Sequence, residues 1–110
     1  MAQYIIYFNQ QWVGDHSSEW FQSRGPLARA VVSELKDAGA LVFAGGLVEE
    51  IELAVGIDEN GKIGSPITTD GEFIGGMTII DVQTDEEANR WGAKIAQACG
   101  WPQEVRKFKG

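Results

Sequence analysis

The sequence predicts an α+β domain of ferredoxin-like βαββαβ type, with one antiparallel sheet and two helices on one face of it. Three observations lead to this prediction: short β-branched and aromatic runs, two segments with helical spacing, and the order in which they alternate. A strand, a helix, two or three strands, a helix and a strand give α+β rather than a doubly wound sheet. Right-handed crossovers then lay both helices on the same face. The 110 residues suit a single domain spanning 1–110.

The first strand and helix are expected in the first third of the chain. Residues 3–8 are mostly β-branched or aromatic, which predicts a strand. Ser17 or Ser18 can cap a short helix after it, and Gly25 and Pro26 should interrupt that helix. Because proline fits a first helical turn, a second helix should begin there.

This second helix should carry one apolar stripe. Leu27, Val31 and Leu35 recur at every fourth position, which places them on one side of a helix. Gly39 is the expected glycine just beyond its last turn.

The middle of the chain is expected to form two or three strands. Residues 40–48 are strand-like, and their paired glycines, Gly45 and Gly46, mark a bend, a bulge or a close backbone approach. Residues 52–57 and 62–69 should form a hairpin, the second strand being a short edge. Asn60-Gly61 favours a type I′ turn between them, because both residues adopt positive φ readily.

The last third should contain a strand, a helix and a final strand. Residues 77–82 are strand-like. Thr84 and Glu87 form a capping box for the second long helix, which Gly100 and Pro102 should end. Residues 103–109 alternate and should form the last strand.

Apolar side chains are expected on both faces of this sheet, and the helices cover only one. We therefore expect a symmetric homodimer that pairs its sheets face to face.

Composition limits the partners. The net charge is -7, and an acidic surface repels phosphate backbones, so no nucleic acid is expected. The chain has a single cysteine, Cys99, which argues against a disulfide-bonded secreted protein. No apolar run is long enough to cross a membrane, and the first residues do not have a signal-peptide pattern. We expect a cytoplasmic protein without a membrane partner.

Several segments resemble the YCII-related, or DGPF-type, family. The resemblance is carried by residues 33–42, by the glycine-rich segment 44–47, by 68–73, and by 75–82 with the helix start at 85–91. It implies a dimeric α/β barrel of ferredoxin-like subunits and a pocket near the glycine-rich loop. The family has no agreed reaction, and some members are proposed enzymes with a His-Asp pair. Related barrels include lactone isomerases and cofactor-free monooxygenases.

The chain departs from the family pattern at three positions. Glu72 stands where the motif has proline, and the polar loop after it is shortened to Ile74. Near Pro26 the sequence has no histidine where one branch of the family carries it. The His-Asp pair therefore does not transfer to this chain.

Three groups are candidates for acid-base chemistry. His16 is the only histidine, and histidine side chains titrate near neutral pH, but its position in a loop favours an exposed residue without a catalytic role. Asp70 and Glu72 share a tight turn, where neighbouring carboxylates can divide acid and base roles. The alternative is an Asx-type turn in which Asp70 bonds the local backbone.

Four further residues are candidates for ligand binding. Arg24 or Arg29 could pair with Asp70, while Trp12 and Trp20 flank His16 and could line a pocket or merely cover the sheet. No metal-binding or phosphate-binding motif is present, so no metal and no cofactor are expected.

Two hypotheses for function follow. The first is a small organic molecule bound near the Asp70 turn, with an isomerase- or lyase-like proton transfer if the protein is an enzyme. The second is a non-catalytic dimeric interaction or regulatory protein. A cavity in which polar groups converge would favour the first.

Overall fold

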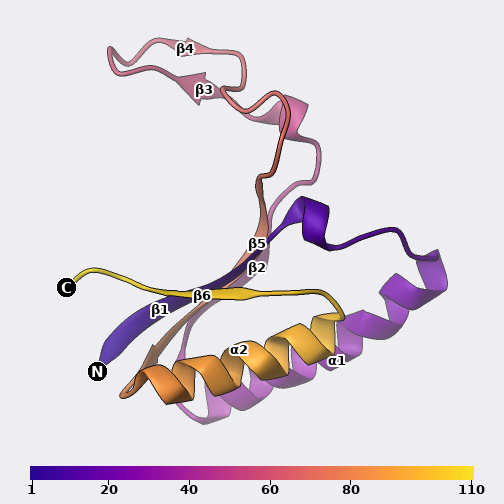
Figure 1. Cartoon of the computed structure of the whole chain (residues 1–110), viewed down its shortest axis with the longest axis vertical. Helices are drawn as coiled ribbons and strands as arrows, with labels where there is room; N and C mark the ends of the chain where they lie inside the picture. Colours follow the sequence, from indigo (N-terminus) through magenta and orange to yellow (C-terminus); the bar gives the residue numbers. More distant parts are fainter.

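The computed structural model describes residues 1–110. Six strands, two long helices and two short 3₁₀ turns follow one another along the chain (Figure 1). They are β1 (Ala2–Asn9), η1 (Gln10–Trp12), α1 (Ser18–Asp37), β2 (Leu41–Gly46), η2 (Ile51–Leu53), β3 (Gly56–Ile57), β4 (Ile63–Gly64), β5 (Ile74–Val82), α2 (Asp85–Cys99) and β6 (Glu104–Lys107).

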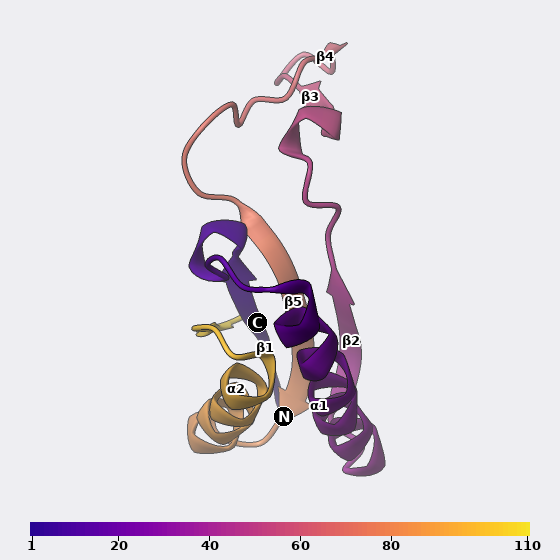
Figure 2. The ribbon, with the colours of Figure 1, turned by 90° about the vertical axis from the view of Figure 1, so that its right-hand side faces the viewer.

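Four strands form one antiparallel sheet in the order β2-β5-β1-β6. Both helices cover the same face of it (Figures 1 and 2). The expected α+β class, with an antiparallel four-stranded sheet and two helices, is confirmed. β3 and β4 pair only with each other, outside this sheet.

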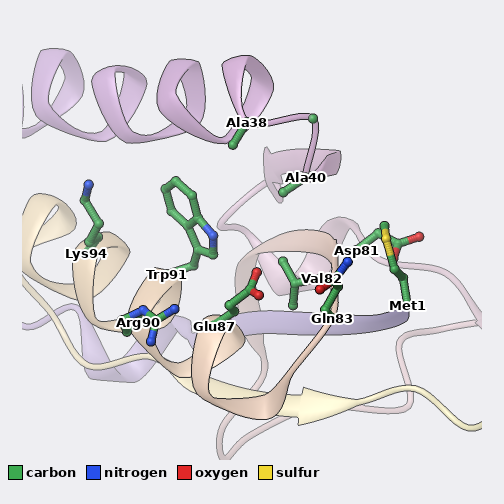
Figure 3. A pocket seen from close by; sticks show the side chains of 11 residues that line it. Met1, Ala38, Ala40, Asp81, Val82, Gln83, Glu87, Arg90, Trp91 and Lys94 are labelled. Carbon is green, nitrogen blue, oxygen red and sulfur yellow. The ribbon is translucent and has the colours of Figure 1, made fainter.

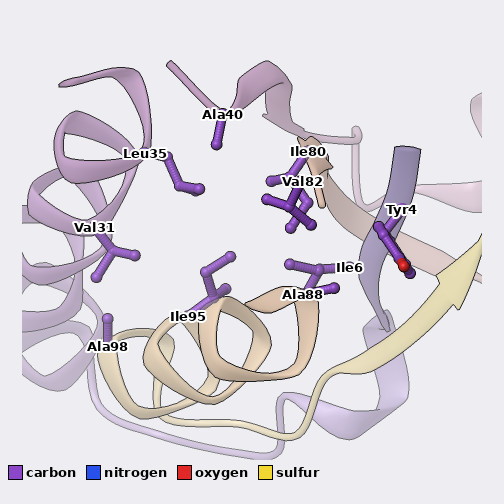
Figure 4. Close-up of a cluster of buried hydrophobic side chains, with 10 residues drawn as sticks. All are labelled: Tyr4, Ile6, Val31, Leu35, Ala40, Ile80, Val82, Ala88, Ile95 and Ala98. Carbon is purple, nitrogen blue, oxygen red and sulfur yellow. The ribbon is translucent and has the colours of Figure 1, made fainter. Parts of the chain in front are cut away.

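The hydrophobic core lies between the helices and one face of the sheet (Figure 4). Tyr4 pairs with Ile80 across β1 and β5, and every second residue of these strands points toward the helices because side chains alternate along a strand. Val31 and Leu35 are buried on α1, as their spacing predicts, but Leu27 is 48% exposed, so the stripe does not extend to the turn that contains Pro26. The complete cluster is Tyr4, Ile6, Val31, Leu35, Ala40, Ile80, Val82, Ala88, Ile95 and Ala98.

The opposite face of the sheet, called here the open face, has no cover. The alternate residues of the central strands lie on it, with Ile5 paired to Ile79 and Tyr7 paired to Met77. All four side chains are partly exposed. The apolar character expected on both faces is therefore present.

The predicted helix ends are largely confirmed. The Ser17 side chain accepts a hydrogen bond from the Trp20 backbone N–H at 3.1 Å, and Thr84 accepts one from the Glu87 N–H at 3.1 Å. Gly39 and Gly100 follow the two helices with φ of 73° and 91°, a conformation that glycine adopts without a steric cost.

The expected interruption at Gly25 and Pro26 is wrong, because α1 continues through both residues. Proline removes one backbone hydrogen bond inside a helix. The turns before it are held by tertiary packing instead: Trp20 and Phe21 pack against Trp101, with ring centroids 6.1 and 6.5 Å away.

The expected hairpin in the middle of the chain is much shorter than predicted. Residues 52–57 contain η2 and only two strand residues, and residues 62–69 contain only two more. The turn is also not type I′, because no residue other than glycine has positive φ. Asp58 closes it instead: its side-chain Oδ1 accepts hydrogen bonds from the Asn60 and Lys62 backbone N–H groups at 2.9 Å.

Residues 47–73, called here the arm, leave the end of the sheet between β2 and β5 (Figures 1 and 2). In Figure 1 the helices lie below the sheet, and the arm rises above it before its tip turns toward the side of the termini. The molecule measures 42 × 41 × 19 Å, and its radius of gyration is 15.5 Å. A compact chain of this length would have roughly 13 Å.

Close backbone approach explains the glycine pairs. Gly46 pairs with Gly76 across β2 and β5, and a Cβ at Gly76 would lie 2.8 Å from the Phe8 ring. The one irregularity in this pairing lies between Leu41 and Phe43, so Gly45 and Gly46 do not form a bulge. Neither helix is both long and apolar enough to serve as a membrane span.

Candidate functional site

The three acid-base candidates are placed in separate surroundings. Asp70 is exposed near the end of the arm, and no hydrogen bond or ion pair links its carboxylate to another side chain. His16 stacks on Trp20 with ring centroids 3.6 Å apart, and its Nε2 lies 2.9 Å from the Val13 carbonyl oxygen. The structure therefore does not join Asp70 and His16 into one acid-base pair.

Glu72 has a structural role. Its carboxylate accepts hydrogen bonds from Asn9 Nδ2 at 3.0 Å and from Trp12 Nε1 at 3.2 Å. Beside it, the Phe73 backbone N–H donates to Gln11 Oε1 at 3.1 Å. These contacts fasten the end of the arm to η1. Trp12 thus contacts a carboxylate and the Tyr7 ring, 6.1 Å away, rather than lining a cavity with His16.

The two arginines also separate. The Arg24 guanidinium lies 4.9 Å from the Trp20 ring centroid, within the range of a cation–π contact. Arg29 lies one turn further along α1, above Gly25, in an open groove between α1 and β2 that also contains Lys36. Neither arginine forms an ion pair with Asp70.

A cavity of about 200 Å³ lies inside the fold, between the two helices and the end of the sheet where β2 leads into the arm. Its wall is mainly apolar and includes small residues whose short side chains leave the space open. Among the residues that line it are Ala28, Val32, Ala44, Ile95, Cys99 and Gln103. Gly45 and Gly46 of β2 also lie in this wall.

Three hydrogen-bond donors are buried without a partner: Gln103 Nε2, in the wall of this cavity, and Arg24 Nε and Trp101 Nε1, whose residues neighbour the wall without lining it. Gln103 is part of the wall, and the Trp101 ring lies 5.2 Å from that of Phe8, which also lines the cavity. Arg24 lies close enough to Cys99 in the wall for its charge to act on the thiol.

The unpartnered donors indicate what the cavity can hold. A buried N–H without an acceptor costs about 1–3 kcal/mol, and all three groups donate rather than accept. An incoming acceptor would satisfy them. Arginine in particular favours carboxylates and phosphates, because its planar fork matches their geometry.

Cys99 does not offer nucleophilic chemistry here. Burial raises the pKa of its thiol, and the positive charge of Arg24 opposes that rise only in part. Since the thiolate is the nucleophilic form, the protonated thiol acts as an apolar wall residue.

A wider groove of about 520 Å³ lies at the other end of the helices (Figure 3). Figure 3 shows Trp91 projecting from α2 toward α1, with Lys94 beside it. Lys94 is paired with Glu34 at 2.9 Å, while Arg90 and Glu87 bring charges of both signs. We therefore favour the smaller apolar cavity as the candidate site.

Sequence reasoning did not identify Trp101 or Gln103. Gly100 and Pro102 were interpreted only as the end of a helix, although four tryptophans in 110 residues signalled an aromatic cluster. Trp20 and Trp101 belong to that cluster, and neither lines the cavity. No family model matches the chain, and no match was found among curated proteins.

Proposed function

We propose that this protein binds a small carboxylic acid with a compact apolar body in the cavity between its helices and its sheet. One observation carries the proposal: the wall of an otherwise apolar cavity holds the unpartnered donor Gln103 Nε2, and two more unpartnered donors, Arg24 Nε and Trp101 Nε1, are buried beside wall residues. The carboxylate would accept from Arg24 and from Trp101 or Gln103. The apolar body would fill the space beside Ala28 and Ala44.

The volume limits the size of the ligand. A dry cavity of roughly 150 Å³ accommodates benzene, so about 200 Å³ suits a benzene-sized or short branched aliphatic acid. Larger substrates would have to protrude through the opening of the cavity.

Binding has more support than turnover. Asp70, Glu72 and His16 do not line the cavity, and Glu72 is already hydrogen-bonded to Asn9 and Trp12. A cofactor-free isomerase- or lyase-like step through these groups thus has no shared site in one subunit. A non-catalytic regulatory protein that senses a small acid accounts for the same geometry.

We further propose that the subunit is ferredoxin-like and functions as a cytoplasmic homodimer related to the YCII-type barrels. The strand order β2-β5-β1-β6 with both helices on one face supports this. The apolar open face, with Ile5 beside Ile79, supports burial against a second copy.

Isothermal titration with benzoate tests the binding proposal, with benzyl alcohol as the uncharged ligand of similar size. We expect benzoate to bind more tightly. Arg24→Gln should weaken benzoate binding by about 10- to 100-fold, because hydrogen bonds to charged groups contribute about 1.5–3 kcal/mol. Ala44→Leu should fill the cavity and abolish binding of both benzoate and benzyl alcohol.

Arg90→Gln is the matched control, since it removes the same charge from an exposed position on α2 in the groove at the other end of the helices. Its affinity for benzoate should stay within about twofold of the wild type, because exposed charges contribute little. The proposed site would be contradicted if the two arginine variants lost affinity for benzoate equally, or if the wild type did not bind benzoate.

A further inference from the structure

The arm exposes an unusual amount of apolar surface. Seven of its aliphatic side chains are between 50% and 78% exposed: Leu47, Val48, Leu53, Val55, Ile57, Ile63 and Ile67. A fully buried aliphatic side chain corresponds to roughly 60–120 Å² of apolar surface, so together they expose on the order of 400 Å². Apolar patches on monomers rarely exceed a few hundred Å² unless they bind something.

The arm is nevertheless built as a defined hairpin. Asp58 closes its turn through two side-chain hydrogen bonds, and a Cβ at Gly56 would lie 2.1 Å from the Ser65 carbonyl oxygen. Its two strands pair only with each other, and a lone two-stranded hairpin is marginally stable in water. An ordered but uncovered hairpin of this kind indicates a missing partner surface.

The area available points to a second copy of the chain. Only 16 of 110 residues are buried in the single subunit. A standard interface buries about 800 Å² on each partner. The arm supplies about half of that area by the estimate of side-chain surface above, and the open face, with Ile5, Ile79 and the 54% exposed Phe43, adds to it.

Charge complementarity indicates where the arm lies on that copy. The arm carries many more acids than bases, with Glu49, Glu50, Glu52, Asp58 and Glu59 on its outer part against Lys62 alone. Residues 104–110 carry Arg106, Lys107 and Lys109 against one acid, Glu104, which accepts a hydrogen bond from Tyr7, while Lys107 lies 3.8 Å from Asp85. Opposite charges on two patches steer them together and fix their register.

We infer that the arm clasps a second copy of this chain, packing its aliphatic side chains along β6 and the C-terminal segment of the partner. A two-fold axis gives each subunit one arm and one receiving edge. Because strand β6 is an edge of the sheet, the arm would also cover backbone groups that are otherwise open to pairing. This inference rests on the proposed homodimer and adds the segment that holds it together.

The first test measures mass in solution by light scattering over a concentration series. The wild type should have twice the subunit mass of 12.0 kDa. Ile57→Asp combined with Ile63→Asp should raise the dimer dissociation constant at least 100-fold while circular dichroism stays unchanged. Leu27→Asp, at a 48% exposed position on α1, is the matched control and should leave the mass unchanged.

The second test reverses charges on the two patches separately. Glu50→Lys with Glu52→Lys makes an arm-reversed chain, and Arg106→Glu with Lys109→Glu makes a tail-reversed chain. Each alone should dimerise more weakly than the wild type by tenfold or more at low salt. Mixed together they should form a heterodimer, because both contacts between the two chains then pair opposite charges.

The outcomes separate the two proposals. A wild type that is monomeric at all concentrations overturns both the homodimer and the clasp. A dimer that survives the arm variants, but dissociates when Ile5 and Ile79 are changed to Asp, overturns the clasp alone. Failure of the two charge-reversed chains to pair with each other also overturns the clasp.

Discussion

Gly92 is the position where one added methyl group tests how α2 fits against β6. The residue is buried on α2, and a Cβ placed there would lie 2.7 Å from Val105 Cγ2. Two carbon atoms in favourable contact are about 3.5–4.0 Å apart. Either Val105 or its strand must therefore move by about 1 Å, and a β-branched side chain cannot turn aside freely.

Two opposing effects determine how Gly92→Ala changes the free energy of unfolding. Alanine favours the helix over glycine by about 0.8–1.0 kcal/mol. Overpacking a core contact costs about 1–3 kcal/mol. We expect the free energy of unfolding to fall by about 1 kcal/mol, since the steric cost exceeds the gain in helix propensity.

A double-mutant cycle checks this reasoning by urea denaturation. Val105→Ala removes the opposing methyl groups, and in that background Gly92→Ala should stabilise the protein by about 1 kcal/mol. The coupling between the two positions should then be about 2 kcal/mol. If Gly92→Ala stabilises the wild-type background equally, β6 moves without cost and the tight fit is refuted.

Three other changes have outcomes set by the structure. Leu35→Ala should lower the free energy of unfolding by about 3–5 kcal/mol, because Leu35 is fully buried in the core. Leu53→Ala, on the exposed arm, should change the free energy of unfolding of the monomer by less than about 1 kcal/mol. Denaturant titration of the two variants measures both values. The hydrogen bond from the Tyr4 hydroxyl to Asp85, together with burial, raises the pKa of Tyr4 to about 12. Its unfolded pKa is about 10, so the stabilisation is complete below pH 10 and is lost as the pH rises toward 12. Stability measured from pH 9 to 12 should therefore fall more steeply for the wild type than for Tyr4→Phe, and parallel curves would contradict the assignment. Glu72→Ala should lower the free energy of unfolding by roughly 1 kcal/mol, because two exposed hydrogen bonds are lost. It should also speed hydrogen exchange of the Phe73 backbone amide. An unchanged exchange rate would show that Glu72 does not fasten the arm.

Local sequence patterns predicted the elements whose stability comes from neighbouring residues. The capping hydrogen bond from the Glu87 N–H to Thr84 and the left-handed Gly100 involve groups within a few residues of each other. The alternation in β1 and β5 likewise follows from side-chain periodicity. These features appeared where the sequence placed them.

Patterns failed where distant residues decide the conformation. Pro26 should end a helix on local grounds, but Trp101 lies beside the preceding turns and holds them in α1. Residues 52–57 have strand-like composition, but the four-stranded sheet offers them no neighbouring strand. Strand propensity has little effect without a partner.

The candidate site likewise combines residues that the sequence suggested with contacts that only the fold creates. Arg24 was a candidate from the sequence, but its association with Trp101 and Gln103 depends on the end of α2 folding back against α1. Asp70 and Glu72 are neighbours in the chain and Trp12 is distant from both, yet the structure joins Glu72 to Trp12 and leaves Asp70 exposed. Proximity between residues remote in sequence is a property of packing and has no local pattern.

The sequence by itself thus determined an α+β chain with two capped helices, a sheet of four strands and apolar residues for both of its faces. Capping and periodicity act over a few residues, so the local chemistry suffices for these features. Only the tertiary structure decided that the helices and the sheet leave a small cavity with one unpartnered donor in its wall and two more beside it, and that residues 47–73 extend away as an arm. Neither feature has a local pattern, because side chains from four or more separate segments pack together in the core. The space left between them is determined only when all of these segments are in place.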